Sequence, residues 1–277
     1  MSFQSVYLTI DDSPSKDFKN KVQFLMKNKI PALFFCIGQQ IPGASEELKY
    51  AIEHGYHIGN HSYSHKHFSS LSLKACLEDI NKADKLIADL YQSCGIKSYP
   101  KVFRFPFGDK GDYKFGFNLY PFDQIYEIKL GRKKRLAYKM LKPLAFYSHK
   151  KEKGMVRANK VQEHLKSLGY TPPSINIDHP FYEKFKRDRD WMWTLDLEDY
   201  KLMNNEDLNN ALQNTYALLE TKRPNAGYTP SFKEKETSNL SSNILLTHDY
   251  ENNGELFYHT IEYMLQSGYI FKKPLKK

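Results

Sequence analysis

The sequence predicts an α/β fold in which parallel strands alternate with helices. Short runs of β-branched and aromatic residues alternate with longer segments whose apolar residues recur every three to four positions, as in strands joined by crossover helices. Five groups of polar residues each follow a predicted strand. The chain has 277 residues, of which 40% are hydrophobic, and this is enough for one large α/β domain or two small ones.

The predicted elements follow from the spacing of apolar residues. Short apolar runs predict strands at residues 6–10, 32–37, 56–59, 101–103, 191–195, 243–247 and 270–271. Helical spacing predicts helices over residues 16–28, 45–54, 73–92, 159–168, 207–220 and 256–266. Ser45 is a candidate cap at the start of the second helix, and Gly169 and Gly268 follow the ends of two others.

Residues 109–157 interrupt this alternation. The segment begins with a glycine- and aromatic-rich loop and continues as a basic stretch with some apolar residues at helical spacing. Residues 128–160 contain twelve Lys or Arg and one acid, a charge of +11, so that the rest of the chain carries −2 of the total of +9. We therefore expect one domain over residues 1–277 with an insertion at about 109–157.

Composition argues against several classes of protein. The mean hydropathy is −0.65 and no apolar run reaches 18 residues, so no transmembrane segment is expected. Residues 1–12 lack the basic start of a signal peptide. The three cysteines form no C-x-x-C pair and are expected to be reduced. These features predict a cytoplasmic protein.

Two pairs of side chains that commonly bind metals are the most informative feature. Asp11 and Asp12 follow the first predicted strand, and His61 and His65 follow the third. One carboxylate and two imidazoles form a three-ligand metal set that leaves a position for water, as in hydrolytic metal sites. Adjacent carboxylates at a strand end point in opposite directions, so one can bind metal while the other acts as a base. The i, i+4 spacing would put both histidines on one face if that stretch is helical.

Further polar residues follow three later strands. They are Arg104, the pair Asp196 and Asp199, and His248. In a parallel α/β barrel the carboxyl ends of all strands open on one face, so these residues should converge. Arg104 can hold a carboxylate in its ionised form. His248 suits a general acid, and a nearby aspartate would orient it and raise its pKa.

The five stretches resemble the motifs of the polysaccharide deacetylases of carbohydrate esterase family 4, the NodB-homology domain. The family motifs T-F-D-D-G-P, H-S/T-x-x-H, R-x-P-Y/F-G, D-x-x-D-W and L-x-H have counterparts, in the family's order, at residues 9–14, 61–65, 104–108, 196–200 and 246–248. The resemblance implies a distorted (β/α) barrel, with the basic segment inserted between the third and fourth motifs.

The resemblance also implies a role for each matched position of the metal site. Asp12, His61 and His65 would hold a divalent metal. Asp11 would be the general base, and Arg104 would orient it. Zinc is the expected metal, and cobalt, nickel or iron are alternatives for this set of nitrogen and oxygen ligands.

The remaining matched positions would act on the substrate. His248 would be the general acid, and Asp199 would tune it. The backbone N–H of Phe107 would help to stabilise the oxyanion. Tyr63 and Tyr200 stand where the family often has tryptophan, and we expect them to contact the substrate.

The implied function is a metal-dependent hydrolase that removes N-acetyl groups from an amino sugar in a polysaccharide or glycan precursor, as in the biosynthesis of cell-envelope polysaccharides. One alternative is a deformylase or deacetylase of a lipid-linked amino sugar. Another is a catalytically silent carbohydrate-binding protein. The intact positions for ligands, base and acid favour an enzyme.

Three interpretations of the basic residues 129–160 remain open. The simplest is a solvated helix face. Cations interleaved with Leu and Met also suit phosphate or lipid headgroups, which would fit a nucleotide- or lipid-linked sugar and association with a membrane surface. Nucleic-acid binding is the least favoured, because no known nucleic-acid-binding motif accompanies the charge.

Overall fold

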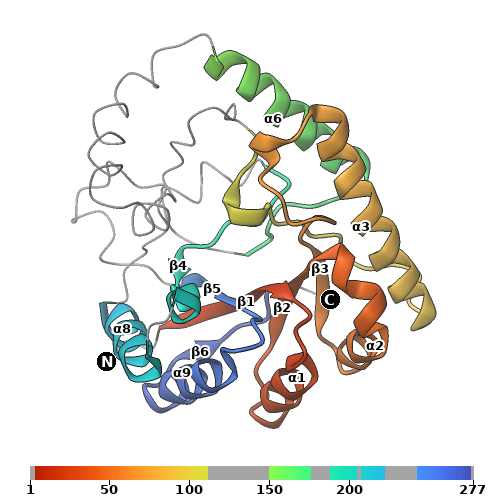
Figure 1. Cartoon of the computed structure of the whole chain (residues 1–277). Coiled ribbons are helices and arrows are strands. Elements are labelled where there is room, and N and C mark those ends of the chain that lie inside the picture. Colours follow the sequence, from red (N-terminus) through yellow and green to blue (C-terminus); the bar gives the residue numbers. More distant parts are fainter. Residues whose placement is uncertain (1–3, 112–149, 176–187, 205–206, 222–241, 276–277) are drawn as a thin grey trace.

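The computed structural model describes residues 4–111, 150–175, 188–204, 207–221 and 242–275, and the structural statements below concern these residues (Figure 1). Their strands form one parallel sheet: β1 (Ser5–Ser13), β2 (Ala32–Cys36), β3 (His57–Asn60), β4 (Leu195–Asp196), β5 (Ser242–His248) and β6 (Ile270–Phe271). The strand order is β3-β2-β1-β5-β4, and β6 pairs with the first residues of β1. The predicted α/β class with parallel strands is confirmed.

The sheet continues beyond β3 and closes towards β4. Asn60 forms a parallel bridge with Phe103, and the Trp191 N–H donates to the Phe103 carbonyl at 2.8 Å. The segment that begins at Trp191 then enters β4, which pairs with β5. Backbone contacts therefore run from β3 through residues 103 and 191–196 back to β5, so the distorted (β/α) barrel is confirmed.

The barrel is distorted because two of its predicted strands are reduced to short contacts. Residues 101–103 make only isolated bridges, to Asn60 and to Tyr170. In the predicted strand 191–195, only Leu195 enters β4. Both segments have a strand-like composition, but each finds a backbone partner along only part of its length.

Alternation along the strands separates two apolar layers. Val6, Leu8 and Ile10 of β1 pack in the cluster that the helices cover. Tyr7 belongs instead to the cluster on the inside of the barrel, with Phe35 and the two tryptophans of the chain. Since side chains alternate along a strand, Thr9 and Asp11 share the inner side with Tyr7. A carboxylate therefore stands at the inner mouth of the barrel.

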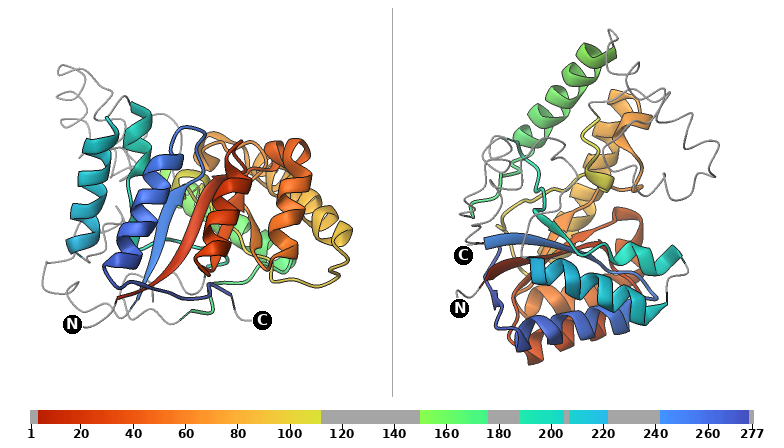
Figure 2. Two further views of the ribbon diagram at one scale, coloured as in Figure 1. Left: turned by 90° about the horizontal axis from the view of Figure 1, so that it is seen from below. Right: turned by 90° about the vertical axis from the view of Figure 1, so that its left-hand side faces the viewer.

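Most of the helices cover one face of the sheet, and one lies farther out against another helix (Figures 1 and 2). The helices are α1 (Phe18–Lys27), α2 (Ser45–Glu53), α3 (Leu73–Ser93), α6 (Lys150–Ser167), α8 (Leu208–Thr221) and α9 (Gly254–Gln266). Neighbours in space follow the order α8, α9, α1, α2, α3, with α6 packed against α3. All six predicted helices are confirmed, although α6 begins at Lys150 instead of residue 159, because its first turns lack the apolar spacing used to predict it.

The cap predicted for α2 is wrong. The residue that precedes the helix is Ala44, and Ser45 is its first residue. The Ser45 hydroxyl donates backwards to the Ile41 carbonyl at 3.1 Å. The reason is that a 3₁₀ helix (Gly38–Ala44) leads directly into α2 and supplies that carbonyl.

The predicted insertion at 109–157 lies largely outside the described residues, as do the basic residues 129–149. Its role, the single-domain organisation and the partners expected for it stay predictions. At its far end, Arg157 of α6 donates to the carbonyls of Gly111 at 2.6 Å and Leu71 at 3.1 Å. The middle of α6 is thus hydrogen-bonded to loops near the barrel mouth.

None of the helices in the described part of the chain is long and apolar enough to cross a membrane. The cytoplasmic location expected from the sequence stays a prediction. Cys36, Cys76 and Cys94 are free thiols, as expected.

Candidate metal centre

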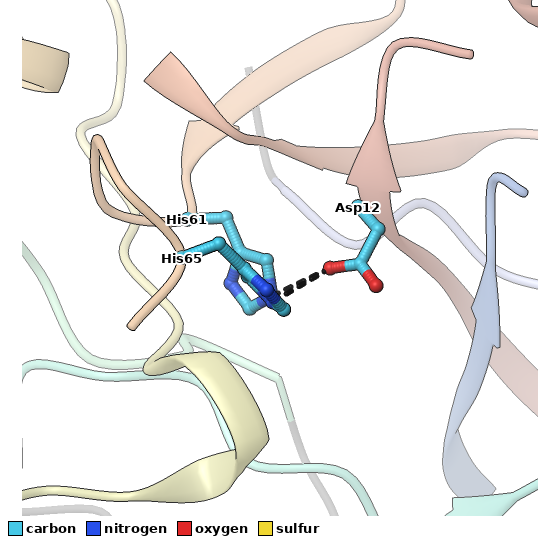
Figure 3. Close-up of side chains that lie close together, drawn as sticks. All are labelled: Asp12, His61 and His65. Atoms are coloured by element: carbon cyan, nitrogen blue, oxygen red, sulfur yellow. Dashed lines mark ion pairs between the residues drawn. The ribbon is translucent and has the colours of Figure 1, made fainter. Parts of the chain in front are cut away.

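Asp12, His61 and His65 lie together at the carboxyl ends of β1 and β3 (Figure 3). Asp12 Oδ1 is 3.3 Å from His61 Nε2 and 2.9 Å from His65 Nε2. The candidate ligand atoms of all three residues lie within 4.8 Å of one another. Tetrahedral ligands with bonds of about 2.0–2.2 Å stand roughly 3.4 Å apart, so these side chains fit a zinc-sized ion with little movement.

The hydrogen bonds of His61 favour a cation at this position. Its Nδ1 lies 2.8 Å from the Arg104 carbonyl, which can only accept, so Nδ1 carries the proton. In the neutral ring, Nε2 then presents its lone pair to Asp12 Oδ1. That oxygen is buried and has no hydrogen-bond partner among the described residues. Two acceptors that face each other without a donor are satisfied by a proton or a metal ion between them.

Charge at the site keeps Asp12 ionised. Burial raises the pKa of the Asp12 carboxyl, but His65 and His61 outweigh burial and hold that pKa well below its usual range. A divalent metal requires the same ionised carboxylate, and it requires both imidazoles to be neutral.

The loop that carries the histidines is not helical, so the premise of the i, i+4 argument is wrong. Ser62 and His65 have φ values of 62° and 52°. Asn60 Oδ1 accepts the Ser62 N–H at 2.8 Å, and Asp79 of α3 accepts the next two backbone N–H groups at 3.0 and 3.2 Å. These contacts, instead of a helix, bring the two imidazoles to ring centroids 5.0 Å apart.

Unusual backbone conformations concentrate in the motifs. Among the described residues, six that are not glycine have positive φ, and five of these lie in four of the five motif stretches. The five are Asp12, Ser62, His65, Phe107 and Glu198. Such conformations cost free energy and persist where surrounding contacts over-determine them, as at functional sites.

Arg104 fixes one oxygen of Asp11. Its side chain is 0% exposed. Arg104 Nη1 donates to Asp11 Oδ1 at 2.7 Å and to Thr9 Oγ1 at 2.8 Å, and Nε donates to the Trp191 carbonyl at 2.9 Å. The other carboxylate oxygen, Asp11 Oδ2, lies 3.7 Å from His61 Nε2. Asp11 therefore keeps one oxygen on the arginine and turns the other towards the candidate metal ligands.

Asp199, which is buried, and His248, which is partly buried, form a close pair. His248 Nδ1 donates to Asp199 Oδ1 at 2.6 Å. Asp199 Oδ2 accepts the Thr247 hydroxyl and the His248 N–H, each at 2.7 Å. Burial would raise the pKa of Asp199, but His248 and Thr247 hold it below its usual value. The predicted contact between Asp199 and His248 is present in the structure.

The aspartate determines the charge of His248. Burial opposes a charged imidazole, but Asp199, with smaller contributions from Asp12 and Asp11, outweighs burial and raises the pKa of His248 to about 10. His248 is also the register partner of Asp11 across the β1–β5 pair. The protonated imidazole of His248 therefore stands beside the carboxylate of Asp11.

Sequence reasoning missed Tyr250. Its ring stacks on His248 with centroids 4.9 Å apart and planes 4° apart. Burial, followed by Asp12 and Asp199, raises the pKa of its phenol, so the hydroxyl remains protonated. Its place two residues after His248 was the only signal in the sequence, and it lies just outside the fifth motif.

The remaining predicted residues lie at or near the mouth. Phe107 has a φ of 57°, and its ring is 42% exposed, stacked on His67 at 4.0 Å and 4.7 Å from the His65 ring. The Tyr63 ring lies against Gly38 and below the Lys82 ammonium, at 5.3 Å from its centroid, so it packs on α3. The roles expected of both residues stay predictions.

The fourth motif contains two further titrating side chains. Burial raises the pKa of Asp196 to about 7, against the opposing charge of His248. Burial and the neighbouring carboxylates Asp196 and Glu198 raise the pKa of Tyr200. Tyr200 is partly buried beside these acids, and its contact with substrate stays a prediction.

Comparison with known proteins confirms the resemblance drawn from the motifs. Residues 1–115 match the family model for polysaccharide deacetylase. The chain is 33% identical over 109 residues to the peptidoglycan-N-acetylmuramic acid deacetylase PdaC of Bacillus subtilis, which covers 39% of this chain and 22% of that protein. It is 27% identical over 106 residues to a chitooligosaccharide deacetylase of Bradyrhizobium sp., which covers 38% and 47%. The matches thus span less than half of either relative.

Solved structures of carbohydrate esterase family 4 share the fold. The catalytic domain of a peptidoglycan N-acetylglucosamine deacetylase from Eubacterium rectale superposes with a TM-score of 0.57 at 16% identity, covering 99% of this chain and 89% of that one. A family 4 pseudoenzyme from Bacillus anthracis superposes with a TM-score of 0.53 at 15% identity, covering 97% and 63%. An enzyme and a pseudoenzyme share this fold, so the side chains of the site have to decide activity.

Proposed function

From the membership of residues 1–115 in the polysaccharide deacetylase family, we propose that this chain is a metal-dependent hydrolase that removes N-acetyl groups from an amino sugar. The family match contains Asp11, Asp12 and the two histidine ligands but ends before Asp199 and His248. The observation that carries the proposal is the register pairing of Asp11 with His248, because it sets a candidate acid from outside the match beside the candidate base inside it.

Asp12, His61 and His65 would hold the metal, with zinc as the expected ion. A divalent metal bound there would lower the pKa of a water molecule and polarise an amide carbonyl. Support for this ligand set comes from Asp12 Oδ1, which is buried, lacks a hydrogen-bond partner among the described residues and faces two imidazole nitrogens.

Asp11 would take a proton from the attacking water through Oδ2. Its Oδ1 is engaged by Arg104, whereas Oδ2 faces the metal ligands. An ion pair on one oxygen fixes the carboxylate in position while leaving the second oxygen able to accept a proton. The Phe107 N–H would donate to the oxyanion, which forms as the carbonyl is attacked.

His248 would give a proton to the departing sugar amine from Nε2. Its Nδ1 donates to Asp199, so the tautomer is fixed and the imidazolium is stabilised before the reaction. The amide C–N bond breaks, the amine leaves with the proton from His248, and acetate is the second product.

The substrate class follows from chemistry shared with the relatives. PdaC is named for N-acetylmuramic acid in peptidoglycan and the rhizobial relative for chitooligosaccharides, and both are N-acetylated glycans. We infer an N-acetylated sugar in a polysaccharide or its precursor for this chain. The basic residues 129–160 would favour a substrate in which this sugar is linked to a lipid or a nucleotide.

A catalytically silent carbohydrate-binding protein is the second candidate. It is favoured by the structural neighbour that is a pseudoenzyme. It would bind the same sugars without releasing acetate.

Metal analysis and an acetate-release assay on one protein sample distinguish the two candidates. The assay would use oligomers of N-acetylglucosamine, peptidoglycan fragments, and nucleotide-linked and lipid-linked N-acetyl sugars. We expect about one equivalent of a divalent metal and acetate release from at least one sugar. A protein that binds a sugar but releases no acetate with zinc, cobalt, nickel or iron would contradict the proposal.

A further inference from the structure

Asn253 stands immediately before α9 (Gly254–Gln266) and is 1% exposed. An asparagine at the N-cap of a helix usually accepts a hydrogen bond from a backbone N–H of the first turn through its side chain. Asn253 occupies this position but makes no such side-chain bond to α9. Its buried amide is therefore engaged elsewhere.

The amide joins three groups around the Asp199–His248 pair. Asn253 Nδ2 donates to the His248 carbonyl at 2.8 Å and to Asp199 Oδ2 at 3.2 Å. Asn253 Oδ1 accepts from Lys21 Nζ at 2.8 Å. Both amide hydrogens and the amide oxygen thus have partners, so burial leaves no polar atom of this side chain unsatisfied.

Lys21 determines which way the amide faces. This lysine of α1 is fully buried, and its Nζ also donates to Asp249 Oδ1 at 2.6 Å and to the Tyr250 carbonyl at 3.1 Å. An ammonium has donors only, so the atom of Asn253 that faces it has to be the oxygen. The NH₂ group is consequently directed at Asp199 and His248.

We propose that Asn253 is a positioning residue for the acid of this site, a proposal that rests on the function proposed above. One side chain holds the carboxylate of Asp199 and the backbone of His248 at once. Thr247 and His248, the last two residues of β5, supply the two other donors to Asp199 Oδ2. Asn253 comes after the loop that follows β5. It therefore fixes the carboxylate so that Oδ1 meets His248 Nδ1.

Two substitutions separate positioning from simple packing. Asn253→Ala removes all three contacts. Asn253→Asp keeps an acceptor for Lys21 but loses the donor and sets a second carboxylate against Asp199. The matched control is Asn243→Ala, because Asn243 is equally buried in β5, at the other end of that strand, where its Oδ1 accepts from Thr194.

The first readout is steady-state acetate release from an N-acetylglucosamine tetramer by the zinc-loaded protein. We expect both Asn253 variants to lose about tenfold or more in kcat with little change in KM, since hydrogen bonds to charged groups act on that order. The Asn243 variant should keep the kcat of the unsubstituted protein. Asn253→Asp with unchanged kcat would show that the residue only anchors Lys21 and would overturn the proposal.

The second readout needs neither metal nor turnover. A short Nδ1–H···Oδ1 bond shifts its proton far downfield in the NMR spectrum, and His248→Gln identifies the resonance by its loss. We expect this resonance to move upfield or broaden in Asn253→Ala and to stay in place in Asn243→Ala. An unchanged resonance in Asn253→Ala would overturn the proposal.

The two proposals fail separately. If the unsubstituted protein releases no acetate from any sugar, the function proposed above fails, and the downfield proton alone decides for or against Asn253. If the unsubstituted protein is active and both Asn253 variants match it in kcat and in the resonance, the function stands and the positioning role fails.

Discussion

Asp11 and His248 are register partners at the carboxyl ends of β1 and β5, two hydrogen-bonded parallel strands. Both side chains belong to the inner side of the barrel mouth, where Arg104 holds Asp11 and Asp199 holds His248. Arg104 forms an ion pair with the carboxylate of Asp11, and the carboxylate of Asp199 keeps the imidazole of His248 charged. Residues 237 positions apart thus lie next to each other at the mouth, where we propose that they act as base and acid.

Asp11→Asn should separate metal binding from turnover. Asparagine keeps an oxygen for Arg104 but cannot accept a proton from water, so we expect normal metal content and a loss of about 10²–10⁴-fold in kcat. Metal analysis and acetate release on the same sample provide the measurement. A variant with full activity would exclude Asp11 as the base.

His65→Ala should lose both metal and activity. Removing one of three protein ligands leaves a carboxylate and one imidazole, which hold a divalent ion far less tightly. The matched control is His259→Ala, because His259 lies exposed on α9. Equal metal content in the two variants would argue against His65 as a ligand.

Asp199→Asn should flatten the pH dependence of stability in the metal-free protein. The pKa of His248 is raised to about 10 in the folded chain, against about 6.5 when unfolded. Its contribution to stability is therefore fully present below about pH 6.5 and is lost as the pH rises towards 10. Without the carboxylate the pKa of His248 should fall. The stability of the variant should therefore change much less between about pH 6.5 and pH 10.

Urea unfolding at pH 6 and pH 9.5 measures this difference. The unsubstituted protein should lose more stability between the two pH values than the Asp199→Asn variant. The same loss in both proteins would mean that the pair does not set the charge of His248.

Arg104→Met should lower the free energy of unfolding by about 3–5 kcal/mol, because it leaves the buried carboxylate of Asp11 without its cation. The surface pair Lys16–Glu251, 3.3 Å apart and largely exposed, supplies the comparison. Lys16→Ala should change stability by less than about 1 kcal/mol. Urea unfolding of both variants at one pH tests the difference, and similar losses would contradict the assigned burial of the Arg104–Asp11 pair.

Much of the fold could be predicted because its signals are local. β-Branched runs and helical spacing located the strands and helices, and polar residues directly after a strand indicated the mouth. Two weak strands, at 101–103 and 191–195, were overpredicted, since composition cannot tell how much of a segment finds a backbone partner. The prediction that His61 and His65 lie together was right, but the reason given for it was wrong. Hydrogen bonds to Asp79 and Asn60, and not a helix, determine the conformation of this loop.

The sequence alone determined which residues stand at the strand ends, because the alternation of apolar residues and the spacing within each motif are local patterns along the chain. Only the tertiary structure decided which oxygen of Asp11 meets Arg104, which nitrogen of His61 is left as an acceptor, and why Asn253 turns away from its own helix. Each of those choices depends on a hydrogen-bond partner tens or hundreds of residues away, and such a partner is defined only when the barrel closes.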